Sequence, residues 1–225
     1  MIRLEEEIVT CRKCPRLVAW REEVARVKRR AYLEWDYWGK PVPGFGDPGG
    51  RVLVVGLAPG AHGANRTGRM FTGDSSGDFL YPALSRAGFA SQPESVRSSD
   101  GLVMTDMFIP SIVRCAPPKN KPTAAELRNC LPYLEREIEL LGNLKVIVAL
   151  GRIGFDWTLR LLRQTGHDIP RLNFGHGVQY KLGEGLPWMV ASYHPSRQNT
   201  QTGRLTEAMF AEIWNLVRDL LDARQ

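Results

Sequence analysis

Four short runs of apolar, largely β-branched residues constrain the fold of this chain more than any other feature. They occupy residues 52–57, 102–109, 146–150 and 187–192. Because nearly every position in them is apolar, they are typical of strands buried on both faces, as in a parallel sheet. Helical patterns lie between and after them, at residues 76–87, 123–141, 153–162 and 205–221. This alternation predicts a three-layer α/β/α sandwich with a central four-stranded parallel sheet.

Local signals mark where some elements begin. Thr123 followed by Glu126 forms the capping-box pattern at the start of one helix. Residues 41–50 are rich in proline and glycine and separate a basic, helix-like N-terminal arm from the rest of the chain. A chain of 225 residues with 43% apolar residues can bury one full core. We therefore predict a single domain over residues 1–225, in which residues 1–40 form a helical arm.

Each predicted strand is followed by a loop of glycine, proline or polar residues. These loops are residues 56–60 (GLAPG), 114–120 (RCAPPKN), 151–154 (GRIG) and 194–199 (HPSRQN). In open α/β sheets, ligands bind at the carboxyl ends of the strands. We therefore expect the four loops to converge on one site.

The four cysteines form two groups. Cys11 and Cys14 are a C-x-x-C pair in the arm, whereas Cys115 and Cys130 lie about a hundred residues later. One interpretation is a four-thiolate metal site that pins the arm to the domain, and another is four separate structural cysteines. Thiolates bind both zinc and iron–sulphur clusters, so the spacing does not choose between the two.

Net charge and hydropathy indicate the kind of partner and the cellular location to expect. It has 30 Lys and Arg against 24 Asp and Glu, a net charge of +6, which suits a polyanionic partner such as nucleic acid. The first residues contain no apolar signal core, and no run approaches the roughly 20 apolar residues of a membrane span. Four cysteines are too few for a disulphide framework at this length. We expect a soluble cytoplasmic protein.

Taken together, the motifs resemble those of a known family. The GLAPG loop is followed by residues 71–77 (FTGDSSG), 115–122 (CAPPKNKP) and 194–203 (HPSRQNTQTG). This set is similar to the type B (family five) uracil-DNA glycosylases, and the cysteines match that family's cluster ligands in order and rough spacing. The resemblance implies a monomeric, monofunctional glycosylase that removes uracil, and other deaminated bases, from DNA at the nucleoid. It also implies a [4Fe–4S] cluster held by Cys11, Cys14, Cys115 and Cys130.

The glycine loop departs from related enzymes in a way that matters for catalysis. Leu57 and Ala58 stand where type A and classical enzymes carry polar side chains, so this loop supplies no carboxylate to activate water. Asp74 is then the best candidate to orient water and stabilise the cationic sugar of the transition state. The structural alternative is that Asp74 caps the helix that follows it.

Further base-binding residues follow from the resemblance. Gly56, Pro59 and Gly60 suit a tight loop whose backbone approaches the ligand, although an ordinary strand-to-helix turn would look alike. Phe71 is expected to stack on the extruded base, with a core phenylalanine as the alternative. The remaining base-binding candidates are Leu57, Ala58, His62, Asn120, Ser111 and His194.

These polar candidates have distinct expected roles. Asn120 carries a donor and an acceptor that could pair with the base, or it could be a turn residue. His194 is expected to donate to O2 of the leaving uracil, and the alternative is a histidine that caps the end of a strand. His194 and Asn120 are thus the catalytic candidates beside Asp74. His62 could contact substrate or phosphate, and the short hydroxyl of Ser111 would read bases loosely. The predicted DNA contacts are Ser196, Arg197, Gln198 and Asn199.

Three other functions remain open on the sequence. The chain could be a glycosylase acting mainly on other damaged bases. It could be a non-enzymatic iron–sulphur protein that binds damaged DNA. It could also be a nucleotide-binding α/β protein with a zinc staple, although the GLAPG loop lacks both G-x-G-x-x-G and the P-loop lysine.

Overall fold

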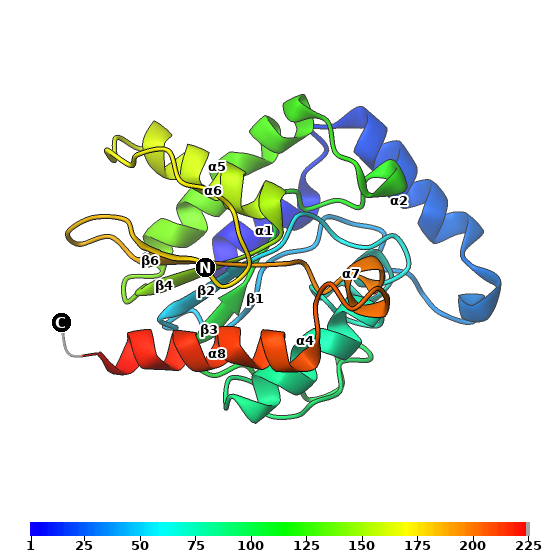
Figure 1. Cartoon of the computed structure of the whole chain (residues 1–225). Helices are drawn as coiled ribbons and strands as arrows, with labels where there is room; N and C mark the ends of the chain where they lie inside the picture. Colours follow the sequence, from blue (N-terminus) through cyan, green and yellow to red (C-terminus); the bar gives the residue numbers. More distant parts are fainter. Residues whose placement is uncertain (224–225) are drawn as a thin grey trace.

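The computed structural model describes residues 1–223 and contains a six-stranded mixed sheet with the order β1-β3-β2-β4-β6-β5 (Figure 1). The strands are β1 (Phe45–Gly46), β2 (Val52–Val55), β3 (Met107–Ile109), β4 (Val146–Leu150), β5 (Gln179–Lys181) and β6 (Trp188–Ser192). The four inner strands are parallel, and the two edge strands are antiparallel to their neighbours. The prediction of a parallel core was therefore right, but a four-stranded sheet was wrong. Both missed strands are short edge strands with no continuous apolar run.

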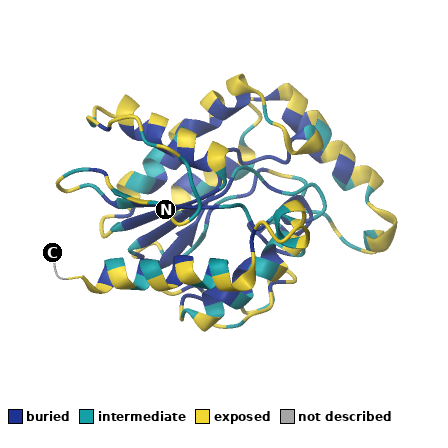
Figure 2. Ribbon diagram, in the orientation of Figure 1, coloured by how far each residue is buried: buried dark blue, intermediate teal, exposed yellow. Residues whose placement is uncertain are grey.

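Helices cover both faces of the sheet, so the α/β expectation is confirmed. They are α1 (Ile2–Thr10), α2 (Pro15–Val27), α3 (Ala64–Thr67), α4 (Ser75–Arg86), α5 (Ala124–Leu140), α6 (Arg152–Gln164), α7 (Arg197–Gln201) and α8 (Glu207–Asp222), with short 3-10 turns at η1 (Arg30–Tyr32) and η2 (Pro118–Asn120). Along β2, Val52 and Val54 join the apolar cluster under α4 and α8, whereas Leu53 and Val55 join the one under α5 and α6 (Figures 1 and 2). Successive side chains of a strand point to opposite faces, which explains why the run is apolar throughout.

The order of the strands produces a crevice at their carboxyl ends. The chain passes from β2 to its neighbour β3 by way of α4 and then returns to β4 on the other side of β2. The helix that follows β2 therefore lies on one face, and the helix that follows β4 lies on the other (Figure 1). Ligand sites of open α/β sheets form at such switch points.

The predicted boundaries hold best where a local signal fixes them. The capping box of Thr123 and Glu126 is present at the start of α5. The predicted strand 102–109 shortens to Met107–Ile109, because the residues before it form an isolated bridge and then turn, with Asp106 in the left-handed region. Within residues 1–223, no helix combines the length and apolarity needed to cross a membrane.

The N-terminal arm docks on α5. Leu4 and Ile8 of α1 pack on Tyr133, and the guanidinium of Arg16 in α2 donates to both oxygens of Glu126 at 2.7 and 2.6 Å. Apolar contact and a bidentate ion pair thus fix both arm helices to one helix of the central unit. The connection between α1 and α2, which carries the C-x-x-C pair, is held beside the helix that carries the fourth cysteine.

A buried ion pair between Glu137 of α5 and Arg114, which follows β3, yields a stability prediction. Arg114 donates to Glu137, and both side chains are at most 1% exposed. Glu137→Ala would leave the guanidinium buried without a counter-charge, so the free energy of unfolding should fall by about 3–5 kcal/mol in urea titrations. Glu7→Ala, which breaks the exposed pair with Arg136, is the control and should change it little. Equal losses in the two variants would contradict this assignment.

Candidate active site

A cavity of about 610 Å³ opens at the carboxyl ends of the inner strands. It is lined by Leu57, Ala58, Gly60, Ala64, Met70, Phe71, Asp74, Ser75, Ser76, Asn120, His194, Ser196, Arg197 and Gln198. Three of the four loops expected to converge therefore do so. The exception is the loop after β4, residues 151–154, which does not line the cavity. It packs behind His194, since a β-carbon built on Gly151 would lie 3.3 Å from Cβ of His194.

Asp74 lies where the glycine loop meets α4. Its Oδ1 accepts hydrogen bonds from the amides of Ser76 (3.0 Å) and Gly77 (3.2 Å), so Asp74 is the N-cap of α4, as the structural alternative predicted. Within residues 1–223, Oδ2 has no hydrogen-bond partner in the protein and packs on the glycine loop. A β-carbon on Gly63 would lie 1.9 Å from Oδ2. One oxygen therefore caps the helix while the other remains available at the cavity.

The charge state of Asp74 depends on opposing effects. Burial raises the pKa of its carboxyl above the ordinary value of 3.8, while the two capping amides and the Arg66 guanidinium oppose the rise. Asp78, one turn further along α4, adds to the increase. Asp74 is therefore a carboxylate that the fold makes harder to ionise, as is common for groups at functional sites.

Phe71 forms one wall of the cavity in a strained conformation. Its φ of +51° lies in the left-handed region, which side chains with a β-carbon rarely adopt. The ring packs against Gly56, where a β-carbon would lie 2.9 Å from Cζ, and its centroid is 5.8 Å from that of the His194 ring. The carbonyl of Phe71 packs against Gly77 in the first turn of α4. Only glycine fits at this position, since a β-carbon there would lie 1.8 Å from the carbonyl oxygen.

His194 follows β6 and faces Phe71. Burial lowers the pKa of its imidazole to about 4, so the ring is neutral near pH 7 and can donate through one N–H. Asn199 donates from Nδ2 to the carbonyl oxygen of His194 at 2.9 Å and does not line the cavity. Ser196 caps α7, and Arg197 and Gln198 are exposed at the mouth of the cavity.

The other predicted residues are distributed less evenly. Asn120 lies at the rim, exposed and in the left-handed region. His62 lies outside the lining, with Nδ1 3.0 Å from the hydroxyl of Tyr37. Ser111 is buried and donates to the carbonyl of Val113 at 2.9 Å, and Pro59 is buried beneath the loop. The lining residues missed from the sequence are Ala64, Met70, Ser75 and Ser76, small or apolar neighbours of the motifs that carry no chemical signal of their own.

All four cysteines are free thiols, and Cys14, Cys115 and Cys130 are buried. Burial raises the pKa of Cys115 to about 11 and that of Cys130 to about 12, and both thiols are close enough to Cys14 for its charge to add to the rise. The guanidinium of Arg21, which is 2% exposed, donates to Sγ of Cys115 at 2.9 Å. In residues 1–223, no three Cys, His, Asp or Glu side chains are arranged as a preformed metal site.

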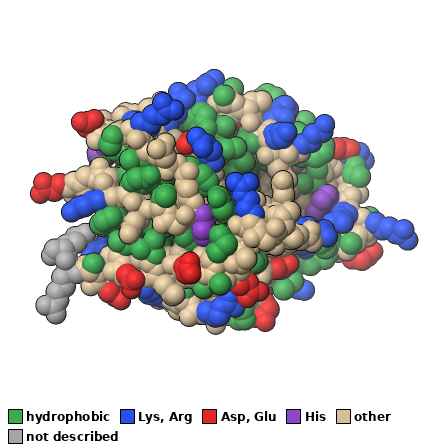
Figure 3. Space-filling view, viewed as in Figure 1, with side chains coloured by type: hydrophobic (Ala, Val, Ile, Leu, Met, Phe, Trp, Pro, Cys, Tyr) green, Lys and Arg blue, Asp and Glu red, His purple; other side chains and the backbone are tan. Residues whose placement is uncertain are grey.

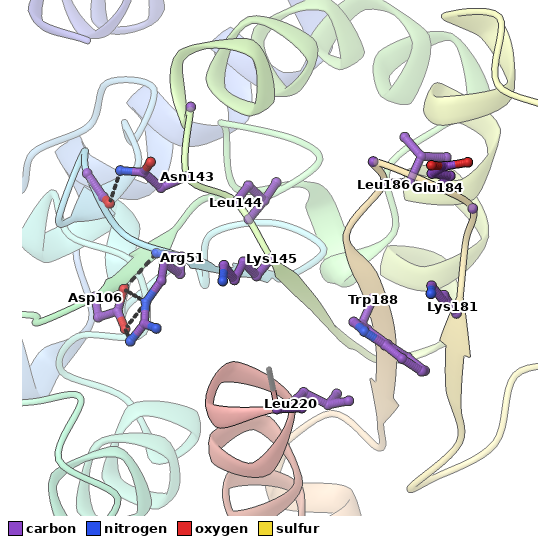
Figure 4. Close-up of a pocket in the computed structure, with 15 residues that line it drawn as sticks. Arg51, Asp106, Asn143, Leu144, Lys145, Lys181, Glu184, Leu186, Trp188 and Leu220 are labelled. Atoms are coloured by element: carbon purple, nitrogen blue, oxygen red, sulfur yellow. Dashed lines mark hydrogen bonds and ion pairs between the residues drawn. The ribbon is translucent and has the colours of Figure 1, made fainter. Parts of the chain in front are cut away.

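A second hollow, of about 840 Å³, lies at the opposite, amino ends of the strands (Figure 4). Its prominent charged pair is Arg51 with Asp106, joined by hydrogen bonds of 2.9 and 3.0 Å. None of the residues singled out from the sequence lines it. The chemistry therefore concentrates at the carboxyl ends of the strands.

The comparisons with known proteins agree with this geometry. The family model of the uracil DNA glycosylase superfamily matches residues 43–218. The type-5 uracil-DNA glycosylase of Thermus thermophilus is 54% identical over 210 residues, which cover 92% of each chain. The type-5 enzyme of Mycobacterium tuberculosis is 52% identical over 95% of this chain and 79% of its own. The type-4 enzyme of Sulfurisphaera tokodaii is 26% identical over 95% of this chain and 83% of its own.

The lowered pKa of His194 can be measured directly. In NMR titrations, its ring should stay neutral through pH 6 and charge with a midpoint near 4. The same ring in the urea-unfolded chain should titrate near 6.5. Because the unfolded chain binds this proton first, His194 should make the free energy of unfolding fall as the pH falls from 6.5 toward 4. A midpoint near 6.5 in the folded protein would show that the ring is solvated.

Proposed function

The chain belongs to the type-5 uracil-DNA glycosylases of the uracil-DNA glycosylase superfamily, and we propose that its cavity removes uracil from DNA by hydrolysing the N-glycosidic bond of an extruded nucleotide. One observation carries the proposal. A free carboxylate oxygen of Asp74, the ring of Phe71 and the neutral imidazole of His194 line the same cavity. A carboxylate, a stacking surface and a hydrogen-bond donor are what this reaction requires.

The cavity receives the base after it leaves the helical stack. Phe71 supplies the aromatic face against which the base stacks, and Asn120 at the rim pairs with its polar edge. Leu57 and Ala58 present apolar surface where a polar side chain would enforce reading of uracil alone. This composition favours acceptance of other deaminated bases as well, because apolar walls discriminate weakly between related shapes.

Asp74 acts on the sugar. Its Oδ1 is fixed by the helix amides, so Oδ2 can orient a water molecule toward C1′ of the flipped nucleotide. As the bond from C1′ to the base nitrogen breaks, positive charge develops on the sugar, and the carboxylate stabilises it. The water oxygen then bonds to C1′, and its proton passes to the carboxylate or to solvent, which leaves an abasic site.

His194 acts on the leaving base. The electron pair of the broken bond moves into the uracil ring, and negative charge accumulates on O2. A neutral imidazole N–H can donate to that oxygen, and the burial that keeps the ring uncharged also strengthens the hydrogen bond.

DNA contacts surround the mouth of the cavity. Ser196 and Arg197 reach phosphate oxygens, and Gln198 occupies space vacated by the flipped nucleotide. The side chain of Asn199 instead supports the His194 loop from within. Lys and Arg side chains are spread over the upper and right-hand parts of the face drawn in Figure 3, whereas many acidic ones lie along its lower edge. The net charge of +6 supports binding to the polyanionic backbone.

Replacement of Asp74 tests the mechanism. Asp74→Asn keeps a capping side chain but removes the charge, so the single-turnover rate of uracil excision should fall by well over about tenfold. The melting temperature should be unchanged or higher, because the fold disfavours the ionised carboxyl. A near-normal rate with a lowered melting temperature would leave Asp74 as a helix cap only.

Two further variants sharpen this result. Asp78→Asn removes a carboxylate from the same helix, one turn away and outside the cavity lining, and should leave the rate near that of the parent. His194→Ala should also slow excision. If both residues act on one transition state, the Asp74→Asn and His194→Ala effects should combine to less than their product.

We propose that the four cysteines bind the cluster that the family resemblance implies. Arg21 is a buried cation, and the carboxylate near it, that of Glu22, lies 3.8 Å away and is already bound by Arg12. Its hydrogen bonds go instead to the thiol of Cys115 and, at 3.4 Å, to the carbonyl of Cys11. An anionic [4Fe–4S] cluster on four thiolates would provide a close anionic partner. Bound by Cys11, Cys14, Cys115 and Cys130, the cluster would join arm residues 1–40 to the rest of a single domain spanning 1–225 and supply structural cross-linking rather than chemistry at the base.

Cluster content can be measured apart from activity. The purified protein should be brown and contain about four irons per chain. Cys115→Ala should lose iron and lower the melting temperature, and activity should fall in proportion to the folded fraction. A colourless protein with one zinc per chain would exclude the cluster.

A further inference from the structure

The turn over residues 70–74 is held by side chains of α3 and α4 and by Arg69. Tyr81 of α4 donates from its hydroxyl to the carbonyl of Met70 at 2.8 Å. Thr67 of α3 donates to the carbonyl of Thr72 at 3.2 Å. Arg69 donates from Nε to the hydroxyl of Thr72 at 2.9 Å, and Arg66 donates from Nη2 to the carbonyl of Gly73 at 2.7 Å, directly before Asp74. Such support is needed because Phe71 adopts a strained conformation within the turn.

Within residues 1–223, Arg66 is a buried cation that forms no ion pair with a carboxylate. Its side chain is 3% exposed, Nε donates to the carbonyl of His62 at 2.8 Å, and Nη1 has no hydrogen-bond partner within residues 1–223. Arg69, the other buried arginine at this turn, differs because Asp100 pairs with it bidentately at 2.8 and 2.7 Å. The charge of Arg69 is thus compensated locally, whereas that of Arg66 is not.

The N-terminal arm holds Arg66 in place. The guanidinium carbon lies 3.9 Å from the ring centroid of Tyr32 and 4.0 Å from that of Trp35. Two aromatic faces at this distance stabilise a cation and fix the plane of the guanidinium. Residues far from the cavity in sequence therefore determine where this positive charge lies.

We propose that Arg66 is a positioning residue for Asp74, and that the clamp of Tyr32 and Trp35 holds it against the turn so that the free carboxylate oxygen faces the reacting sugar. This inference rests on the proposed role of Asp74. Arg66 does not line the cavity; it acts through the Gly73 carbonyl and through its charge.

The charge of Arg66 has a measurable consequence. It opposes the rise in the pKa of Asp74 that burial and Asp78 cause. The other titratable side chains that line the cavity with Asp74 are His194, whose ring is neutral, and Arg197, which is exposed. Removal of Arg66 should therefore raise the pKa of Asp74 further, so that excision declines at a higher pH on the acid side.

The test is the pH profile of single-turnover uracil excision by the full-length protein. Arg66→Met should lower the rate at the plateau of this profile by about tenfold, with duplex affinity unchanged. It should also move the acid limb, the pH range over which the rate falls on acidification, to higher pH. Arg66→Lys retains the charge but not the planar fork, so its acid limb should stay near that of the parent while its plateau rate falls. Trp35→Ala, which opens the clamp, should shift the limb in the same direction as Arg66→Met but less.

Arg218→Met is the matched control. Arg218 of α8 also donates to a carbonyl, that of Ala87 at 2.8 and 2.6 Å, and its guanidinium lies 3.6 Å from the ring centroid of Phe89. Ala87 caps the carboxyl end of α4, whereas Asp74 caps its amino end. Loss of Arg218 should lower the melting temperature without moving the acid limb. If Arg66→Met and Trp35→Ala behave like Arg218→Met, Arg66 is structural only and the inference is wrong.

Failure of this inference can be told apart from failure of the proposed function. An acid limb that disappears in Asp74→Asn but stays at its parental position in Arg66→Met overturns the role of Arg66 alone. A normal rate in Asp74→Asn overturns the proposed mechanism. If Arg66→Met does not fold, Arg66→Lys and Trp35→Ala still decide the question. Arg66→Lys preserves the positive charge, and Trp35→Ala keeps Arg66 itself but removes one of the two rings that hold its guanidinium.

Discussion

Asp74 and Phe71 reach the carboxyl ends of the central strands only because glycine stands opposite each of them. A single methyl group at Gly63 would overlap the Asp74 carboxylate, and one at Gly56 would press on the Phe71 ring. The shape of the cavity, the free carboxylate oxygen and the distance between Phe71 and His194 all depend on these close approaches. Glycine in these loops is therefore a packing requirement more than a source of flexibility.

Buried positive charge is the second theme of the structure. Arg114 donates to the carboxylate of Glu137. Arg21 donates to the thiol of Cys115 and has a carboxylate, that of Glu22, only at 3.8 Å, and Arg66 donates to backbone carbonyls. A buried guanidinium without a hydrogen-bonded carboxylate lowers the stability of the fold unless another group compensates its charge. The proposals give both arginines such a group, the thiolate cluster for Arg21 and the Asp74 carboxylate for Arg66. Arg21 belongs to the N-terminal arm and Arg66 packs on Tyr32 of that arm, so the arm connects the cysteines to the turn that precedes Asp74.

Much of this arrangement could be predicted from local sequence signals. The apolar runs gave the inner strands because a strand buried on both faces must be apolar throughout. Thr123 with Glu126 gave the start of α5, and the position of Asp74 before a helical pattern gave its capping role. Three of the four loops at strand ends meet in the cavity, as the convergence of parallel strands requires. The edge strands were missed because short, partly exposed strands carry no such pattern.

The sequence by itself thus determined the parallel core, three of the loops that line the cavity, and the candidates Asp74, Phe71 and His194. Tertiary structure decided which of the remaining candidates reach the cavity: it turned His62 toward Tyr37 and used Asn199 to hold a loop. It alone revealed the contact of Arg66 with Tyr32 and Trp35, which lie more than thirty residues away in the sequence. The physical reason is that helix caps and buried strands leave patterns among residues that are close together in the sequence. Charge compensation and aromatic clamping depend instead on which distant segments the fold brings together.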